Sequence, residues 1–170
     1  KPAIGKDLIF PMTKEQLGAL ILDSQNALYR VSKSLLCNDT DCADAIQEAI
    51  VHSFAKLHTL KNDQYAKTWL IRILINECYT IMRKEKKLIP LETLPRTDVY
   101  EMEDYSDLYQ AVQKLPQDMR MAVVLHYVEG FSVKEIAEIQ KVSESAVKNR
   151  LFSARKKLRF FLEEEEAKTV

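Results

Sequence analysis

The sequence predicts an all-α protein built from two small helical domains that are joined by an acidic linker. Only three glycines and five prolines occur in 170 residues, and no region shows the closely spaced turn signals of a β-sandwich or β-barrel. Several segments instead repeat apolar residues with the period of an amphipathic helix. At 46% apolar residues, the chain can bury one ordinary core or two small ones.

The first helix is expected to begin at a capping box. Thr13 and Gln16 have the spacing at which each side chain accepts a hydrogen bond from the other residue's backbone N–H. Asp41 is expected to cap the next helix, over residues 42–57. The apolar residues of that helix share one face, which calls for a partner surface on one side: Ile46, Ile50, Phe54 and Leu57.

A long buried helix is expected over residues 68–87. Its beginning, WLIRILI (69–75), could equally form a buried strand, but the pattern continues past Asn76 without Gly or Pro. This length favours a helix with a basic end. Trp69 lies inside the apolar run and is interpreted as a core residue.

Two prolines mark the division of the chain. Pro90 and Pro95 lie in an acidic stretch with little periodicity, which is typical of a linker. We therefore expect a first domain over residues 13–88, a linker over 89–106 and a second domain over 107–166.

The second half shows the pattern of a trihelical or four-helix domain with a helix-turn-helix motif. Pro116 suits a first helical turn, and Gly130 suits the left-handed conformation that ends helices. Ser132 and Glu135 form a second capping box, which starts the motif. Lys141 occupies the turn where such motifs usually have Gly, and a left-handed non-Gly residue costs about 1 kcal/mol. The following helix carries a buried stripe: Val147, Leu151, Ala154 and Leu158.

Charges are segregated along the chain, although the 25 basic and 25 acidic residues cancel. Segments 67–87 and 144–159 each contain six Lys or Arg residues, against two and one acidic residues respectively. The balancing acids lie in residues 91–107 and 163–166. Two basic faces of this kind are typical of nucleic-acid binding, so the distribution of charge is more informative than its sum.

The cysteines and the apolar runs indicate a cytoplasmic protein. Cys37, Cys42 and Cys78 form no CxxC pair and their number is odd, which predicts reduced thiols. No apolar run approaches the ~20 residues of a membrane span, and the first residues lack a secretory signal. Because the sequence starts at Lys1, we expect the natural chain to begin earlier.

The sequence predicts neither a metal site nor an enzymatic activity. His52, His58 and His126 have no metal-ligand spacing with one another or with the cysteines. No phosphate-binding loop, nucleophile elbow or nucleophile–base pair is present. We therefore expect no cofactor, no small-molecule substrate and no catalysis by this chain.

Two blocks of sequence resemble the extracytoplasmic-function (ECF) sigma factors of bacterial RNA polymerase. DCADAIQEAIVHSFAKL (41–57) and TWLIRILINECYTIMRK (68–84) are similar to region 2 of that family. KLPQDMRMAVVLHYVEGFS (114–132), then EIA, then VKNRLFSAR (147–155), are similar to region 4. The resemblance covers about residues 20–162, in the family's order. It implies a factor that binds core RNA polymerase and directs promoter-specific initiation.

The resemblance also implies three sets of contact residues. Core polymerase would bind Asp44, Gln47, Glu48 and Phe54, although Gln47 and Glu48 could equally form a solvated helix face. The minus-10 element, with an unstacked base of the non-template strand, would bind Asn62, Asp63, Lys67, Asn76, Tyr79, Thr80, Arg83 and Lys84. The minus-35 element would bind Lys148, Asn149, Arg150, Phe152, Ser153, Arg155 and Lys156.

The resemblance implies one further partner, and two alternative functions remain open. The resemblance implies an anti-sigma protein, often membrane-anchored, that holds the chain inactive. A regulator of the LuxR type is an alternative, because its DNA-binding module also has an EIA helix, but the first half lacks the alternating strands of a receiver domain. A helical adaptor that binds only proteins is a second alternative, in which the basic helices would tolerate the removal of charge.

Overall fold

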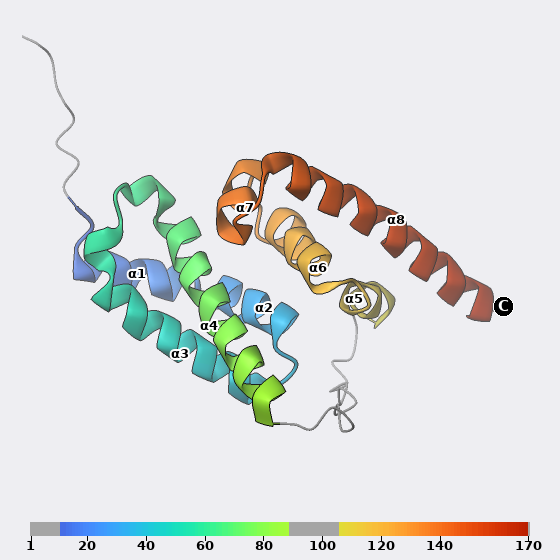
Figure 1. The fold of residues 1–170 in the computed structure, drawn as a ribbon, viewed down its shortest axis with the longest axis horizontal. Coiled ribbons are helices and arrows are strands. Elements are labelled where there is room, and N and C mark those ends of the chain that lie inside the picture. The colour runs from blue at the N-terminus through green and yellow to red at the C-terminus, as the bar shows by residue number, and fades with distance from the viewer. Residues whose placement is uncertain (1–10, 89–105, 170) are drawn as a thin grey trace, which may run out of the picture.

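The computed structural model describes residues 11–88 and 106–169, and the regular elements in these two ranges are all helical (Figure 1). This confirms the predicted fold class, with four α-helices and one π-helix among the described residues of the second half. The N-terminal half contains α1 (Lys14–Asp23), α2 (Gln25–Leu35), α3 (Asp39–Ala55), the short 3-10 helices η1 (Leu57–Thr59) and η2 (Asp63–Tyr65), and α4 (Ala66–Leu88). The C-terminal half contains α5 (Ser106–Gln113), α6 (Gln117–Val123), the π-helix η3 (Val124–Val128), α7 (Val133–Gln140) and α8 (Glu144–Thr169).

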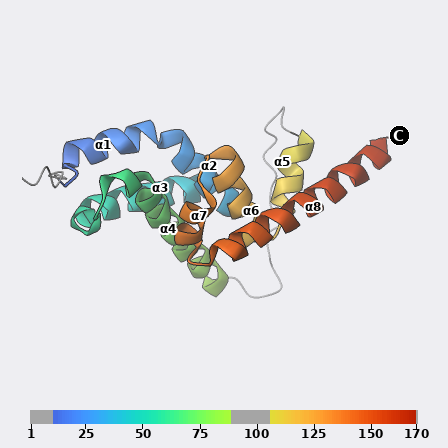
Figure 2. The same ribbon diagram turned by 90° about the horizontal axis from the view of Figure 1, so that it is seen from above.

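The predicted linker, 89–106, lies outside the described residues except for Ser106, where α5 begins. None of the described helices is both long and apolar enough to cross a membrane. Figures 1 and 2 show α3 beside α4, α7 beside α4, and α8 projecting past α5 to the far end of the molecule.

Both predicted capping boxes form. The Thr13 hydroxyl accepts from Gln16 N at 3.2 Å and the Gln16 amide oxygen accepts from Thr13 N at 2.8 Å. Ser132 and Glu135 repeat this exchange at 3.2 and 2.8 Å. Both pairs satisfy amide groups that a first helical turn leaves unbonded, so α1 and α7 start where the sequence predicts.

The predicted cap of α3 is wrong by three residues. Asn38 is the N-cap, and its side-chain oxygen accepts from Asp41 N at 2.7 Å. Asp41 therefore lies in the first turn, where its negative charge still suits the helix dipole. Both residue types cap helices well, so composition alone could not choose between them.

The long helix α4 supplies the centre of the N-terminal core. Its apolar run is helical, with Leu70, Ile71, Leu74 and Cys78 fully buried against neighbouring helices. The preference for a helix over a strand is thus confirmed. Because α4 lies between α3, α2 and α7, it is apolar on most of its circumference, which explains the strand-like run.

The helix-turn-helix consists of α7, a three-residue turn and α8. Ile136 on α7 and Val147 on α8 are fully buried where the helices cross. Lys141 ends α7 in the left-handed conformation, at φ 55° and ψ 47°, as its place in the motif predicts. Gln140 has a defined role, because its amide nitrogen donates to Asp118 O at 3.1 Å and so fastens the turn to α6.

The two halves pack against each other over one continuous buried core. The N-terminal helix α2 contacts α6 and η3, and α4 contacts α7. Gly130, at φ +74°, turns the chain between η3 and α7 and brings both against the first half. The sequence predicts two units with a linker, but not that the units lie in contact.

Candidate nucleic-acid interface

The exposed face of α8 carries most of the predicted minus-35 residues. Of the predicted buried stripe, Val147, Leu151 and Ala154 are buried and Leu158 is half-buried, which turns the other face outward. Phe152 is 55% exposed, an unusual exposure for a large apolar side chain, and Lys156 Nζ lies 5.1 Å from its ring centre. The residues on this outward face are Lys148, Asn149, Phe152, Arg155 and Lys156, with Ser153 half-buried at its edge.

Arg150 does not lie on this face. At 100° per residue it points away from Phe152 and toward α6. Its guanidinium donates to the Gln140 amide oxygen at 3.0 Å and to the Asp118 carboxylate at 3.2 Å. The structure therefore gives Arg150 a role in holding α8 on α6, in place of the predicted position beside DNA.

The side chain of Arg155 is hydrogen-bonded to an aromatic residue. Its guanidinium donates to the hydroxyl of Tyr127, on η3, at 2.9 Å. Tyr127 is 55% exposed, so the arginine stays at the surface rather than being drawn into the core. This contact restricts the orientation of a cation that could otherwise sample many rotamers, and it adds a residue that sequence reasoning missed.

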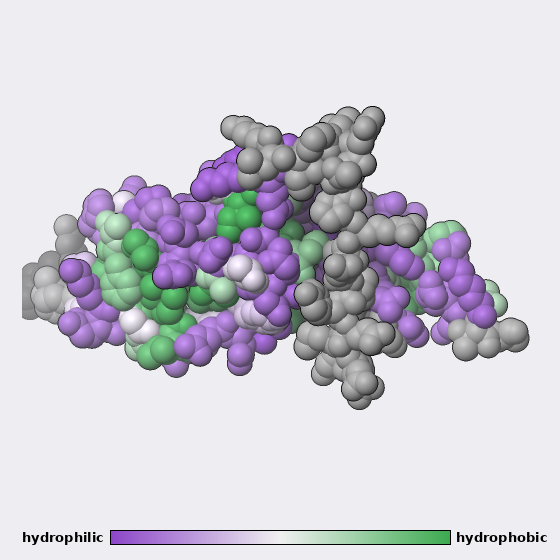
Figure 3. All heavy atoms as spheres, turned by 90° about the horizontal axis from the view of Figure 1, so that it is seen from below, coloured by the Kyte–Doolittle hydropathy of each residue, from purple (hydrophilic) through white to green (hydrophobic). Residues whose placement is uncertain are grey.

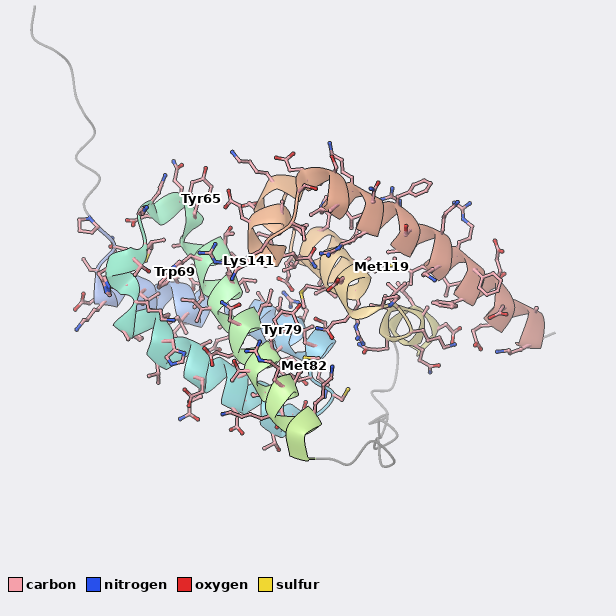
Figure 4. All side chains as sticks on the ribbon, in the orientation of Figure 1. Tyr65, Trp69, Tyr79, Met82, Met119 and Lys141 are labelled. Carbon is pink, nitrogen blue, oxygen red and sulfur yellow. The ribbon has the colours of Figure 1, made fainter. Side chains whose placement is uncertain are left out.

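A cavity of about 420 Å³ opens where the α3–α4 loop meets α4. Its volume lies within the usual range of small-ligand sites, about 300–1,000 Å³. Asn62 is the one predicted minus-10 residue in its wall. Figure 4 shows Tyr65 and Trp69 at this end of α4, and Tyr79 and Met82 farther along the helix. The complete lining is Thr59, Leu60, Lys61, Asn62, Tyr65, Thr68, Trp69, Arg72 and Glu138.

Trp69 is not a fully buried core residue. It packs against the core with one part of its ring and is only half-buried, with the rest lining the cavity. Tyr65 is 44% exposed in the same wall, so two aromatic rings and the Arg72 guanidinium surround one space. Rings and planar cations of this kind stack on nucleic-acid bases.

The predicted minus-10 residues of α4 do not all lie on one side of the helix. Asn76, Thr80 and Arg83 share one side of the helix, and Arg83 donates to the Thr80 hydroxyl at 3.1 Å. Lys67 lies nine residues before Asn76, which places it on the opposite side. Trp69 and Arg72 belong to the side of Asn76, at spacings of seven and four residues, a periodicity that could have identified them.

Three other minus-10 candidates have structural partners. Asp63 accepts from Met12 N at 3.2 Å and ties the loop to the start of α1, and Asn62 caps η2 by accepting from Gln64 N at 2.9 Å. Tyr79 is half-buried and packs against the core. Of these, only Asn62 also faces the cavity.

A second, acidic cavity of about 550 Å³ lies between α3 and α4. It brings together three of the predicted polymerase contacts, Asp44, Gln47 and Glu48, all of them exposed. Two predicted minus-10 residues, Thr80 and Lys84, line this cavity instead of the first one. The remaining lining residues are Asp41, His52, Glu77, Ile81 and Glu85.

Carboxylates dominate the electrostatics of the acidic cavity. Burial, and then the neighbouring carboxylate of Asp41, raise the pKa of Glu85. His52 Nδ1 lies 2.6 Å from Glu77 Oε1 and joins α3 to α4 across the cavity. A basic partner surface would relieve the repulsion between these carboxylates, whereas a DNA backbone would increase it.

Phe54, the fourth predicted polymerase contact, lies outside the acidic cavity, near the C-terminal end of α3. It is 36% exposed, and Val51, one turn earlier, is 57% exposed. Figure 3 shows apolar residues gathered at the end of the molecule where α1 and α3 lie. Among the described residues, no group of three or more His, Cys, Asp or Glu side chains is placed to hold a metal ion.

The chain matches two family profiles. Residues 20–88 match "Sigma-70 region 2" and residues 105–158 match "Sigma-70, region 4". Together the two matches cover most of the chain. They place the acidic cavity in region 2, the first cavity in region 2 except for Glu138, and the outward face of α8 in region 4.

Several characterised proteins are similar over most of their length. RNA polymerase sigma factor SigV of Bacillus subtilis (strain 168) is 30% identical over 158 residues, which are 91% of this chain and 95% of SigV. The ECF RNA polymerase sigma-E factor of Escherichia coli (strain K12) is 26% identical over 137 residues, 68% of this chain and 70% of that protein.

Solved structures agree with this assignment. The sigma factor RpoE from Bartonella quintana, in complex with the anti-sigma factor NepR, superposes with a TM-score of 0.74 at 26% identity, covering 88% of this chain and 98% of RpoE. CnrH, in complex with the cytosolic domain of CnrY, has the same fold, with a TM-score of 0.67 at 24% identity over 89% of this chain and 90% of CnrH. The chain therefore belongs to the sigma-70 family of RNA polymerase sigma factors, in its ECF group, and is a promoter-directing transcription initiation factor.

Proposed function

We propose that the cavity beside Trp69 captures an unstacked base of the minus-10 non-template strand. The observation that carries this proposal is the gathering of Tyr65, Trp69 and Arg72 around one open space, with the Asn62 amide at its rim. Aromatic rings and a guanidinium supply stacking, and an amide can read a base edge. The strand would leave the cavity along Asn76 and Arg83, with Thr80, Tyr79, Lys84, Lys67 and Asp63 as secondary or structural positions.

We propose that the outward face of α8 binds the minus-35 element in the major groove. Lys148, Arg155 and Lys156 supply phosphate or guanine contacts, Asn149 and Ser153 supply hydrogen-bonding groups, and Phe152 supplies an apolar contact for a thymine methyl. Arg150 contributes indirectly, by fixing the angle of α8 through Asp118 and Gln140.

We propose that core RNA polymerase binds the exposed face of α3. Asp44, Gln47 and Glu48 offer acidic and amide groups to a basic partner, and Phe54 with Val51 offers apolar area at one end. Region 2 would then extend over residues 13–88 and region 4 over 107–166, with the linker at 89–106. RNA synthesis is catalysed by the polymerase, and we assign no catalytic step and no cofactor to this chain.

A partner that controls the factor is part of the proposal. The sigma factor RpoE was solved in complex with the anti-sigma factor NepR, and CnrH, which has the same fold, in complex with the cytosolic domain of CnrY. We propose that this chain acts in the cytoplasm and is likewise held inactive by an anti-sigma protein, which can be membrane-anchored.

Transcription in vitro tests the proposed function. Purified chain, core polymerase and a promoter library should give promoter-specific transcripts that depend on the added chain. Trp69→Ala should reduce open-complex formation by roughly 1–3 kcal/mol, the usual contribution of one stacked base, while Trp69→Phe retains most of it. Unchanged open-complex formation by Trp69→Ala would exclude the cavity.

A further inference from the structure

Two of the three cysteines lie together at the start of α3. Cys37 is exposed in the short connection between α2 and α3, and Cys42 is fully buried in α3 itself. Asn38 is the N-cap of α3, so Cys37 is the residue before the cap and Cys42 is the fourth residue of the helix. Side chains at these two positions commonly pack against each other. The capping geometry therefore brings the two cysteines to one place.

The sulfur of Cys42 lies against the backbone that carries Cys37. Its thiol donates to the Leu36 carbonyl oxygen at 3.8 Å, and Leu36 is the residue bonded to Cys37. With standard peptide dimensions, Cys42 Sγ is then within about 7 Å of the Cys37 Cα. The two Cα atoms of a disulfide are roughly 4.4–6.8 Å apart. A local shift of the first turn of α3 is therefore enough to join the two sulfurs.

Polar contacts hold the connection in its present conformation. The Lys33 ammonium donates to the Cys37 carbonyl oxygen at 3.1 Å and to the Asp39 carboxylate at 2.8 Å. The Tyr29 hydroxyl donates to the same carboxylate at 2.9 Å. These bonds keep Cys37 at the surface and the start of α3 on α2, so that a change at either cysteine is felt by the whole connection.

We propose that Cys37 and Cys42 are a peroxide-sensitive thiol pair, which hydrogen peroxide converts to a disulfide. First, the Cys37 sulfur attacks one peroxide oxygen: an S–O bond forms, the O–O bond breaks, and the leaving hydroxide takes the thiol proton and departs as water. The sulfur, now a sulfenic acid, has given two electrons to the peroxide. Cys42 then attacks this sulfur, the S–O bond breaks, a second water leaves and the S–S bond forms. A dithiol reductant restores both thiols.

Burial determines the order of these steps. Cys37 is exposed and is the thiol that peroxide reaches first. Cys42 has no exposed surface, and burial raises the pKa of its thiol, so it attacks only when the first turn of α3 opens. Cys78 is fully buried on α4 and should stay reduced.

The disulfide would change the helix face that we propose for core polymerase. Asn38 caps α3 by accepting from Asp41 N at 2.7 Å, and Asp41 and Asp44 line the acidic cavity. Drawing Cys42 out of the core would break this cap and displace the first turn, because the cap and the buried side chain both hold that turn in place. The effect on polymerase rests on the proposed contact at α3, whereas the thiol chemistry does not.

Peroxide treatment of the full chain, followed by peptide mass spectrometry, tests the thiol pair. We expect a Cys37–Cys42 disulfide that dithiothreitol reverses. Cys42→Ala should leave a sulfenic acid at Cys37 that dimedone traps, and Cys37→Ser, at an exposed position, should abolish the reaction. Cys78→Ala is the matched control and should form the disulfide as the wild type does. Absence of the disulfide in the wild type, or a product that links Cys37 of two chains or Cys42 to Cys78 instead, would overturn the pair.

Hydrogen exchange and polymerase binding separate the thiol pair from the proposed function. Amides of residues 39–44 should exchange roughly fivefold faster in the oxidised chain, and its affinity for core polymerase should fall roughly three- to tenfold. Peroxide-treated Cys37→Ser should show neither change. Faster exchange with unchanged polymerase affinity would remove the start of α3 from the polymerase interface and leave the thiol pair standing. Unchanged exchange in a chain that carries the disulfide would overturn its effect on α3.

Discussion

Arg30 and Glu129 join the two halves of the chain through a two-pronged ion pair between residues 99 positions apart. The carboxylate of this pair is almost completely buried, while the guanidinium remains half-exposed. Arg30→Ala would leave a buried carboxylate without its cation, so we expect a loss of roughly 1–2 kcal/mol in the free energy of unfolding. Urea titration measures this change in the free energy of unfolding. Lys33→Ala, which breaks a pair whose carboxylate is exposed, should cost less than about 1 kcal/mol, and a larger loss there would contradict the ranking.

Lys141 offers a stabilising substitution. Its left-handed conformation is unfavourable for a side chain with a Cβ and is natural for glycine. We expect Lys141→Gly to raise the free energy of unfolding by about 0.5–1 kcal/mol, after the larger chain entropy of unfolded glycine is subtracted. Thermal unfolding followed by circular dichroism measures the change. Lys141→Ala removes the charge but keeps the Cβ and should give no gain; an equal gain would assign the effect to charge.

The three cysteines should differ sharply in reactivity. Cys37 is exposed, whereas Cys42 and Cys78 are fully buried. Burial raises the pKa of both buried thiols, that of Cys78 to about 12, so almost none of the reactive thiolate is present at neutral pH. A maleimide should therefore modify one site in the native chain and all three in urea, as read by mass spectrometry. Rapid labelling of Cys78 in the native chain would contradict its burial.

Arg155 should contribute to minus-35 recognition. Its guanidinium is exposed on the outward face of α8, and Tyr127 holds it there. We expect Arg155→Ala to weaken binding of a minus-35 duplex by roughly 1–3 kcal/mol, measured by anisotropy at fixed salt. Tyr127→Phe keeps the arginine but removes its acceptor and should have a much smaller effect. Unchanged affinity and promoter preference for Arg155→Ala would exclude Arg155 from the interface.

Glu85 should make stability depend on pH in the weakly acidic range. Burial and Asp41 raise its pKa in the folded state, so its ionisation favours the unfolded state. The penalty is absent below the ordinary glutamate pKa of about 4.3, grows as pH rises to the folded pKa, and is complete above it. Glu85→Gln should therefore be more stable than wild type at pH 7 and no more stable near pH 4, by urea titration. Glu163→Gln, at an exposed position of α8, is the control. A loss of stability at pH 7 for Glu85→Gln would contradict the expected direction of the change.

Local patterns in the sequence predicted the parts of the fold that local interactions determine. The capping boxes at Thr13 and Ser132, and the left-handed positions Gly130 and Lys141, follow from residues that contact their own neighbours in the chain. The face of α8 followed from a regular apolar stripe. These features needed no knowledge of what lies across the molecule.

The remaining features depend on contacts between distant segments. Arg150 looked like one more cation of a basic helix, and only its distance to Asp118, 32 residues earlier, shows another role. The apolar neighbours of Trp69 in sequence predict a core residue, although its spacing to Arg72 and Asn76 puts it on the same side of α4 as these two residues. The contact between Arg30 and Glu129 has no periodic signal at all.

The π-helix η3 has a consequence for how this chain can change its length. Glu129 N bonds to Val124 O at 3.0 Å, five residues back, so η3 holds one residue more than an α-helical turn would. Deleting one residue there would restore the α-helical register and rotate the following segment by about 100° around the helix axis. Glu129 and Phe131 would then both leave their partners at once. An insertion or deletion in η3 therefore changes the pairing of the two halves in one step.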